Sequence, residues 1–479
     1  MGRVSTKRFQ ERLVDALGAD AVRTDPEDLA VYSFDAFSEE TLPAAAVLPK
    51  DARDVSAIVR IANELEEPIV PRGAGTGLCG GATPTRGGVV VSFARMNRIL
   101  GLDVPNRRAR VQPGVINLEL SKHAQPHGLF FGPDPSSQKI STLGGNVGTN
   151  AGGPHALSYG SMTNHVLGLE FVSQDGEVHQ ISQDDFGYDL TSALVGSEGT
   201  LGIITAIDLR LLRVPAAVRV CLAAFGDVET ASEAVSAIVG AGIVPTALEI
   251  MDRTITQAVE AHYHAGFPLD AGAVLLVEIA GEIDDIDASE RAIEKIAREH
   301  GALSWRSASE AAEREALWAS RKGAAGAIGR IAPNYYIQDA TVPRTRLPQA
   351  LHRVDEIARD HALQVGNVFH AGDGNLHPLL MFDRRIPSQV EAVIAAGTEI
   401  LEACIALGGT ISGEHGIGYE KRDALRYVFS TDDLATMARV RDVLDPKRIF
   451  NPDKIFPSGA ACGEVRAQPQ VAVGAGAWL

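Results

Sequence analysis

The chain has 479 residues, of which 45% are hydrophobic and 22% charged, a mixture that supports a large folded core and excludes a disordered or fibrous chain. At about 150 residues per domain, this length predicts two large domains or three ordinary ones. The 44 basic and 61 acidic residues leave a net charge of −17, which repels phosphate backbones and argues against nucleic-acid binding.

Four cysteines stand far apart and form no CxxC pair: Cys79, Cys221, Cys404 and Cys462. They suit neither a zinc knuckle, an iron–sulfur cluster nor a disulfide scaffold, and they predict reduced thiols in a cytoplasmic protein. No apolar run reaches the roughly 18 residues that span a bilayer. The first residues also lack the apolar stretch of a signal peptide. We therefore expect a cytoplasmic chain with no transmembrane segment.

Residues 1–45 begin with apolar residues at helical spacing and continue as a polar, acidic link. Residues 46–215 then form the first predicted domain, of the α+β class. It contains one amphipathic helix at about 55–65. Its predicted strands lie near residues 44–48, 68–71, 88–93, 109–112, 167–173, 177–181 and 202–212.

The pattern changes after Pro215, and residues 216–456 form the second predicted domain. Its predicted helices lie at about 228–240, 285–299, 346–361 and 387–407. They alternate with strands at 218–225, 273–280, 335–342 and 364–370. This alternation predicts a sheet covered by helices on one face. Residues 457–479 are rich in alanine, glycine and proline and predict a loose tail.

The first of three glycine clusters spans residues 71–81, and Gly75, Gly77 and Gly80 match GxGxxG after a strand. A dinucleotide site of the Rossmann type needs a helix to start at the third glycine. Here a turn at 81–88 leads into a strand at 89–91, so the Rossmann interpretation fails. The loop can still bind phosphate through consecutive backbone N–H groups, or it can be a turn without a ligand; alone, it favours neither.

Two further clusters lie in the same domain. They comprise PDPSS at 133–137 with GGNVGTNAGG at 144–153, and GSEGTLG at 196–202. Three such stretches beside strands exceed what turns require. Because glycine lets backbone approach a ligand closely, together they predict a long ligand whose phosphates and rings lie along the main chain.

In this order, PRGAGTG, PDPSS, GGNVGTNAGG and GSEGTLG resemble the FAD domain of the vanillyl-alcohol-oxidase and p-cresol-methylhydroxylase (PCMH) flavoproteins. To about residue 456 the chain is similar to the catalytic FAD-linked D subunits of bacterial glycolate oxidases, and to D-lactate and D-2-hydroxyglutarate dehydrogenases. The resemblance implies a two-domain α+β fold. A PCMH-type FAD-binding domain would precede a substrate (cap) domain with a helix-covered antiparallel sheet and a C-terminal return to the flavin.

The resemblance also implies the residues that bind FAD. The residues that would wrap the pyrophosphate are Arg72, Gly73, Ala74, Gly75, Thr76 and Gly77. Those that would face the flavin are Pro133, Asp134 and Ser137, and those that would line the cofactor are Gly144, Asn146, Gly148, Asn150 and Gly153. Ile203 would touch the adenine end, and Asn451 would return to the flavin from the C-terminus. Members with covalent FAD often carry a histidine in the first loop. Thr76 stands there, so we expect non-covalent FAD.

A second group of candidate functional residues lies in the second predicted domain. His370 and His377 stand seven residues apart, and the glycines between them argue against a helix, so a strand–loop–strand would have to bring them together. Glu414 and His415 follow between glycines. Two histidines and a carboxylate with open positions suit Zn, Mn or Fe. The alternative is that they are ordinary core side chains.

The resemblance implies His370, His377 and Glu414 as metal ligands and His415 as the catalytic base. It also implies that an arginine near residue 321 binds the substrate carboxylate. Arg321, in a helical stretch, is our choice, because its planar fork matches a carboxylate. The alternative, that Arg321 or Lys322 belongs to a solvent-exposed helix face, stays open.

We therefore expect FAD-dependent oxidation of a small 2-hydroxy acid to the 2-oxo acid. Glycolate is favoured, and D-lactate or D-2-hydroxyglutarate are the alternatives. The resemblance implies another flavoprotein and an iron–sulfur protein as partner subunits, through which the chain would associate with the membrane. Two other classes stay open. A zinc hydrolase would leave the glycine clusters unexplained, and a flavin-carrying subunit without turnover would leave the histidines unexplained.

Overall fold

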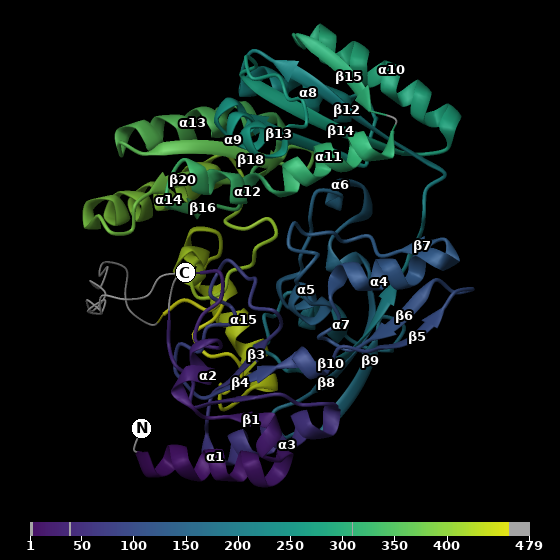
Figure 1. Ribbon diagram of the computed structural model, residues 1–479. Coiled ribbons are helices and arrows are strands. Elements are labelled where there is room, and N and C mark those ends of the chain that lie inside the picture. Colours follow the sequence, from purple (N-terminus) through teal and green to yellow (C-terminus); the bar gives the residue numbers. More distant parts are fainter. Residues whose placement is uncertain (1–2, 38–39, 309, 459–479) are drawn as a thin grey trace.

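The computed structural model describes residues 3–37, 40–308 and 310–458. Figure 1 shows two stacked parts, a front domain that contains β1–β11 and a rear domain that contains β12–β20. The last helix leaves the rear domain and lies among the first elements of the chain.

The first sheet of the front domain has the strand order β1-β2-β4-β3, in which β2, β4 and β3 are parallel. Its elements are α1 (Arg3–Leu17), β1 (Val22–Arg23), α2 (Pro26–Ala30), β2 (Ala45–Val47), α3 (Ala52–Leu65), β3 (Ile69–Arg72) and β4 (Val89–Ser92). Helix α3 begins where the Asp51 carboxylate accepts two backbone N–H groups. After the first glycine cluster and the turn that follows it, the next element is the strand β4; no helix starts there, and the exclusion of a Rossmann site is confirmed.

The second sheet of the front domain is antiparallel, with the order β5-β6-β10-β8-β9. Its strands are β5 (Ile99–Asp103), β6 (Arg108–Val111), β8 (Val166–Val172), β9 (Val178–Ser182) and β10 (Ile203–Arg210), while β7 (Leu129–Phe130) pairs with β11 (Leu212–Arg213). The front domain also contains four short helices that the sequence did not predict: α4 (Asn117–Ala124), α5 (Leu143–Thr149), α6 (Ala156–Tyr159) and α7 (Leu190–Leu194).

The rear domain is one antiparallel sheet with the order β15-β12-β14-β13-β18-β19-β17, to which β20 and β16 add beside β18. Its strands are β12 (Ala217–Phe225), β13 (Ala247–Asp252), β14 (Ala273–Gly281), β15 (Ser304–Ala308), β16 (Asn334–Ile337), β17 (Ala340–Thr341), β18 (Gln364–His370), β19 (Asn375–Leu376) and β20 (Pro378–Phe382).

Helices cover both faces of this sheet, so our expectation of helices on one face alone is wrong. The outer face carries the four predicted helices, α8 (Val228–Gly240), α10 (Ile283–Glu299), α13 (Leu347–Asp360) and α14 (Pro387–Ala406). The other face carries α9 (Arg253–Tyr263), α11 (Ala311–Lys322) and α12 (Ala324–Ala327). The physical reason is that both faces of the central strands are apolar: on β12, Cys221 joins the outer core and Leu222 the inner one. Figure 1 shows α11 and α12 between the sheet and the front domain.

The C-terminal segment ties the two domains together. After α15 (Thr431–Leu444), Phe450 is buried in the core of the first sheet. Backbone hydrogen bonds join Ile69 to Ile449 and Asn451 to Ile69 at 2.8 and 2.7 Å. From residue 459 onward, the expected loose tail lies outside the described residues.

Two composition-based expectations concern the cysteines and the membrane. Cys79, Cys221 and Cys404 are free and buried, while Cys462 lies outside the described residues. Among the helices described, none combines the length and apolar character needed to cross a bilayer.

Candidate active site

One cavity of about 550 Å³ joins residues from both domains. All three glycine clusters line it, and so does part of the histidine cluster. The predicted site residues in its wall are Arg72, Gly73, Ala74, Gly75, Thr76, Gly77, Ser137, Gly144, Asn146, Gly148, Arg321, His377, Glu414 and His415. The fold therefore brings most of the predicted cofactor residues and the predicted catalytic residues to one place.

The remaining predicted residues are not among those that line the cavity: Pro133, Asp134, Asn150, Gly153, Ile203, Asn451 and His370. The side chain of Ile203 is fully buried in the core of the first sheet, and its neighbour Ile204 lines the cavity instead. His370 is buried and contacts Glu414, which does line the cavity.

The first glycine loop has its shape because Gly75 adopts a φ of +71°, where a Cβ would lie 2.2 Å from the Arg72 guanidinium. That guanidinium points into the N-terminal segment and donates hydrogen bonds to the carbonyl oxygens of Phe34 and Val31. Burial lowers the pKa of Arg72. The Arg72 side chain thus anchors the loop to the N-terminal segment, and the backbone of the loop can contact a ligand in the cavity.

Two asparagines and a glutamate hold the loops together. The Asn451 amide donates to the carbonyl oxygens of Gly81 and Glu198 at 2.9 and 2.7 Å, which joins the first and third glycine clusters. Asn150, in the left-handed region at the end of α5, accepts from Thr163 at 2.9 Å. The Glu198 carboxylate accepts the Ile417 N–H at 2.7 Å, so the third cluster also holds the loop that carries His415.

The histidine cluster forms by the strand–loop–strand that the glycine spacing predicts. His370 ends β18, and His377 lies between β19 and β20. Glu414 and His415 lie in the loop after α14. The Glu414 carboxylate oxygen lies 3.0 Å from His370 Nε2, 3.6 Å from His377 Nε2 and 3.9 Å from His415 Nε2. The rings of His377 and His415 stack with centroids 4.8 Å apart.

Asp339 is a member of this cluster that the sequence analysis missed. It is fully buried and accepts the backbone N–H of His415 at 2.9 Å and the Ser412 hydroxyl at 2.7 Å. It also lies 3.4 Å from His377 Nε2 and 3.3 Å from the Lys421 ammonium. Asp339 therefore fixes the loop that carries His415.

Glu249 on β13 is the second missed residue. One of its oxygens lies 2.7 Å from His370 Nδ1 and the other 2.5 Å from Arg321 Nη2. Its carboxylate thus joins the predicted metal ligand to the predicted carboxylate-binding arginine. The signal that could have found Glu249 and Asp339 is a lone acid in an apolar strand segment, because a buried charge needs a partner.

The electrostatics of the cluster follow from burial and from close opposite charges. Burial alone would lower the pKa of His370, but Glu249 and Glu414 raise it to about 10. Burial alone would raise the pKa of Glu414, but His370 and the other two histidines lower it to about 2. Burial lowers the pKa of His415 to about 4, against the pull of Asp339. His415 is therefore neutral near pH 7.

The donor set fits a divalent cation. His377 Nε2 is buried and forms no hydrogen bond, although carboxylate oxygens of Asp339 and Glu414 lie 3.4 and 3.6 Å away. His370, His377 and Glu414 offer three ligand atoms within 4.8 Å of one another, and Asp339, His377 and His415 offer a second, overlapping set. Mixed imidazole and carboxylate ligands are those that Zn, Mn and Fe accept.

Arg321 fits an anionic ligand. Its side chain is buried at the cavity wall, and its Nε and Nη2 atoms lack a hydrogen-bond partner despite the ion pair with Glu249. A guanidinium can donate five hydrogen bonds, so a carboxylate in the cavity would satisfy donors that the protein leaves free.

Comparison with known proteins shows which families and folds the chain resembles. Residues 43–182 match the family described as FAD binding domain, and residues 214–455 match FAD linked oxidases, C-terminal domain. The chain is 43% identical to glycolate oxidase subunit GlcD of Escherichia coli K12, over 94% of this chain and 91% of that protein. It is 32% identical to a D-lactate dehydrogenase of Anaerostipes hadrus, over 90% and 91%. The structure of p-cresol methylhydroxylase superposes with a TM-score of 0.80 at 16% identity, over 95% and 98% of the two chains, which shows the shared fold.

Proposed function

Because this chain belongs to the FAD-linked oxidase family, we propose that it oxidises a small 2-hydroxy acid, glycolate foremost, to the 2-oxo acid. The observation that carries the proposal is the single cavity in which three glycine loops face Arg321, His377, Glu414 and His415. A zinc hydrolase does not need those loops, and a flavin carrier without turnover does not need the buried histidine cluster.

In this proposal the protein binds and orients the substrate and takes its proton. Arg321 binds the carboxylate through Nε, which has no partner in the protein, beside the Nη2 atom that pairs with Glu249. Neutral His415 accepts the hydroxyl proton, held in place by the bond from its backbone to Asp339. FAD would be held without a covalent bond along the glycine loops. It would supply the acceptor for the hydride, which leaves the carbon that bears this hydroxyl.

The proposal includes a divalent metal. His370, His377 and Glu414 would hold it, because their ligand atoms lie within 4.8 Å of one another and His377 lacks a partner. Such an ion would stabilise the negative charge that develops on the substrate oxygen. The Glu249 carboxylate would orient His370 through Nδ1, as carboxylates do for many metal-bound histidines.

The wall of the cavity beside Arg321 supports a short substrate. Ala325, Ile337, Val368 and Leu379 make it apolar. Lys322 also reaches this wall, but it already pairs with Asp134 at 2.8 Å. At this end of the described lining no cation besides Arg321 is left to bind a second carboxylate, so glycolate or D-lactate fits better than D-2-hydroxyglutarate. The higher identity to a glycolate oxidase subunit than to a D-lactate dehydrogenase favours glycolate.

We also propose that the chain works as a subunit, as the name glycolate oxidase subunit GlcD indicates for its Escherichia coli relative. The three described cysteines are isolated and buried, so electrons would leave through partners, another flavoprotein and an iron–sulfur protein. Those partners would place this cytoplasmic chain at the membrane.

Anaerobic titration of the purified protein tests the proposal. We expect a yellow protein that bleaches with glycolate, more slowly with D-lactate and least with D-2-hydroxyglutarate. Colour that no 2-hydroxy acid bleaches would favour a flavin carrier, and a colourless, metal-containing protein would favour a hydrolase.

A further inference from the structure

A second buried polar cluster lies where the two domains meet, outside the histidine cluster. Its centre is His155 of the front domain. Nδ1 of His155 lies 2.8 Å from the Asp134 carboxylate, and Nε2 lies 2.9 Å from the Glu278 carboxylate on β14. Burial alone would lower the pKa of His155, but these two carboxylates raise it to about 10. The proposed chemistry does not use this imidazolium.

Helix α11 closes the cluster from the rear domain. Trp318 donates its indole N–H to Glu278 at 2.6 Å, and the Lys322 ammonium lies 2.8 Å from Asp134. Arg321 pairs with Glu249 on the neighbouring strand β13. Because Arg321 and Lys322 follow Trp318 by three and four residues, these side chains lie on the same side of the helix. That face is therefore attached at two points to the rear sheet and at one point to the front domain.

On the front-domain side, the contact is made by Asp134, which belongs to the second glycine cluster. Asp134 is part of PDPSS, whose residues Pro135 to Ser137 line the cavity. Gly153 packs so closely against it that a Cβ would lie 2.6 Å from the Asp134 carbonyl oxygen. Asp134 is thus fixed relative to the cavity. Because Lys322 pairs with it, the helix that carries both Lys322 and Arg321 is held at a fixed distance from the cavity.

We infer that Asp134, His155 and Lys322 form an interdomain clasp that positions Arg321 over the cavity. They are positioning residues, because their charges are already satisfied by one another and by Glu278. The inference rests on the proposed function for its kinetic consequence, but the clasp itself is a property of the fold.

Lys322→Met tests the clasp, because it removes the ammonium while Asp134 keeps its bond to His155. We expect KM for glycolate to rise about tenfold, as for the loss of one hydrogen bond to a charged group. The kcat value should change by less than about twofold, since the proton acceptor is untouched. FAD content should stay at one per chain, and Lys322→Arg should restore KM.

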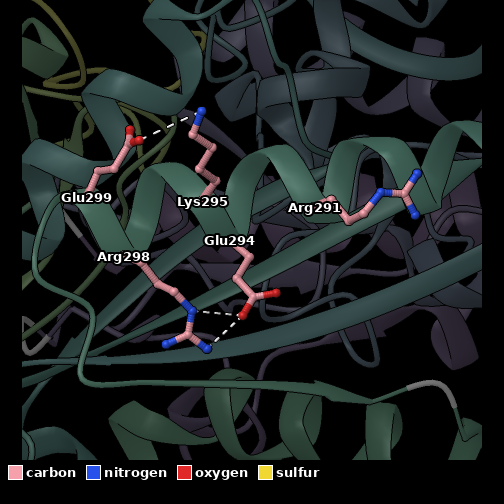
Figure 2. A pocket seen from close by; sticks show the side chains of 5 residues that line it. All are labelled: Arg291, Glu294, Lys295, Arg298 and Glu299. Atoms are coloured by element: carbon pink, nitrogen blue, oxygen red, sulfur yellow. Dashed lines mark hydrogen bonds and ion pairs between the residues drawn. The ribbon is translucent and has the colours of Figure 1, made fainter.

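Arg298→Met is the matched control, because it removes a cation from a rear-domain helix without touching the clasp. The Arg298 side chain is 53% exposed and pairs with Glu294 on the same helix at 2.7 Å, a pairing that Figure 2 marks with dashed lines. This variant should leave KM and kcat unchanged. An unchanged KM in Lys322→Met would overturn the clasp.

Combining Lys322→Met with Asp134→Asn separates positioning from direct contact. If the clasp is right, the double variant is no worse than the worse single variant, because both remove the same link. Multiplying effects would show that Lys322 contacts the substrate itself and would contradict the proposal.

Amide hydrogen exchange gives a readout that needs no substrate. Residues 318–322 should exchange faster in Lys322→Met and in Asp134→Asn than in the wild type, while α13 stays unchanged. Unchanged exchange in α11 would overturn the clasp even if the wild type oxidises glycolate. A wild type that no 2-hydroxy acid reduces, but whose α11 responds as expected, would contradict the proposed function alone.

Discussion

At the scale of single residues, the histidine cluster is marked by one buried nitrogen, His377 Nε2, that no hydrogen bond satisfies. An unsatisfied buried polar atom is costly, and a metal ion would remove that cost. His377→Ala should therefore lower the bound metal from about one ion per chain towards zero, as measured by elemental analysis of dialysed protein. His352→Ala, at an exposed histidine paired with Glu356 on α13, should keep the metal. Normal metal content in His377→Ala would refute the ligand assignment.

Asp252, which caps α9, should make stability depend on pH. Its carboxylate accepts the N–H groups of Ile255 and Asn367, and burial raises the pKa of Asp252 to about 7. An unfolded aspartate titrates near 3.9, so between these values only the folded chain keeps the proton. The contribution of this group to the free energy of unfolding is therefore fully present below about pH 4 and is lost as the pH rises to about 7.

Asp252→Asn removes this titration at the cost of one hydrogen bond, about 1 kcal/mol at every pH. Its thermal midpoint relative to the wild type should rise between about pH 5 and about pH 7.5. Asp51→Asn is the control. Burial raises the pKa of Asp51, but hydrogen bonds from Arg53 and Asp54 together lower it overall, so the group stays ionised over this range. A difference between wild type and Asp252→Asn that is independent of pH would contradict the pKa of Asp252.

Single residues also show where sequence reasoning stops. His370, His377, Glu414 and Arg321 stand in recognisable local patterns, and the structure gathers them at one site. For Glu249 the sequence offers only an acid in an apolar strand segment, because its role arises only when β13 pairs with β18 and α11 packs on the same face. Its partners lie 72 and 121 residues away in the sequence (321 − 249 and 370 − 249).

At the scale of elements, the first glycine loop gives a direct test of close approach. Gly75 and Gly87 both have positive φ, +71° and +70°. A Cβ at position 75 would collide with the Arg72 guanidinium, whereas nothing lies within 4 Å of one at position 87. Both Gly→Ala variants carry the same backbone strain, about 1 kcal/mol or more.

Gly75→Ala should therefore lower FAD affinity beyond what Gly87→Ala does, by tenfold or more if the collision costs a further 1.4 kcal/mol or so. Fluorescence titration of the deflavinated protein with FAD measures this difference. Equal FAD affinities in the two variants would remove the first loop from the cofactor site.

The elements themselves divide into two groups by the kind of signal that they carry. Helices α8, α10, α13 and α14 repeat apolar residues at helical spacing, and they lie where the sequence predicts them within a few residues. Helix α5 was missed because it runs through GGNVGT, a glycine-rich segment with low helix propensity that Thr142 caps. Tertiary packing of Leu143 and Val147 in the front core stabilises it instead.

At the scale of the whole molecule, the cavity exists because distant segments are held together. Phe450 returns the chain to β3, Glu198 accepts N–H groups of the loop after His415, and Lys322 reaches Asp134. Local periodicity contains no information about such contacts. The change of pattern after Pro215 predicted two domains, and the resemblance of four motifs in order implied a PCMH-type FAD-binding domain followed by a cap domain. The family matches and the shared fold confirm this fold.

The central claim is that the flavin of the front domain meets the base of the rear domain. Anaerobic stopped-flow mixing of the FAD-loaded protein with glycolate tests it most directly, with wild type, His415→Ala and His352→Ala compared at saturating substrate. We predict that His415→Ala keeps its FAD but reduces it about 10²–10⁴-fold more slowly, the range expected for loss of a general base, while His352→Ala matches the wild type. Reduction of His415→Ala at the wild-type rate would contradict the account.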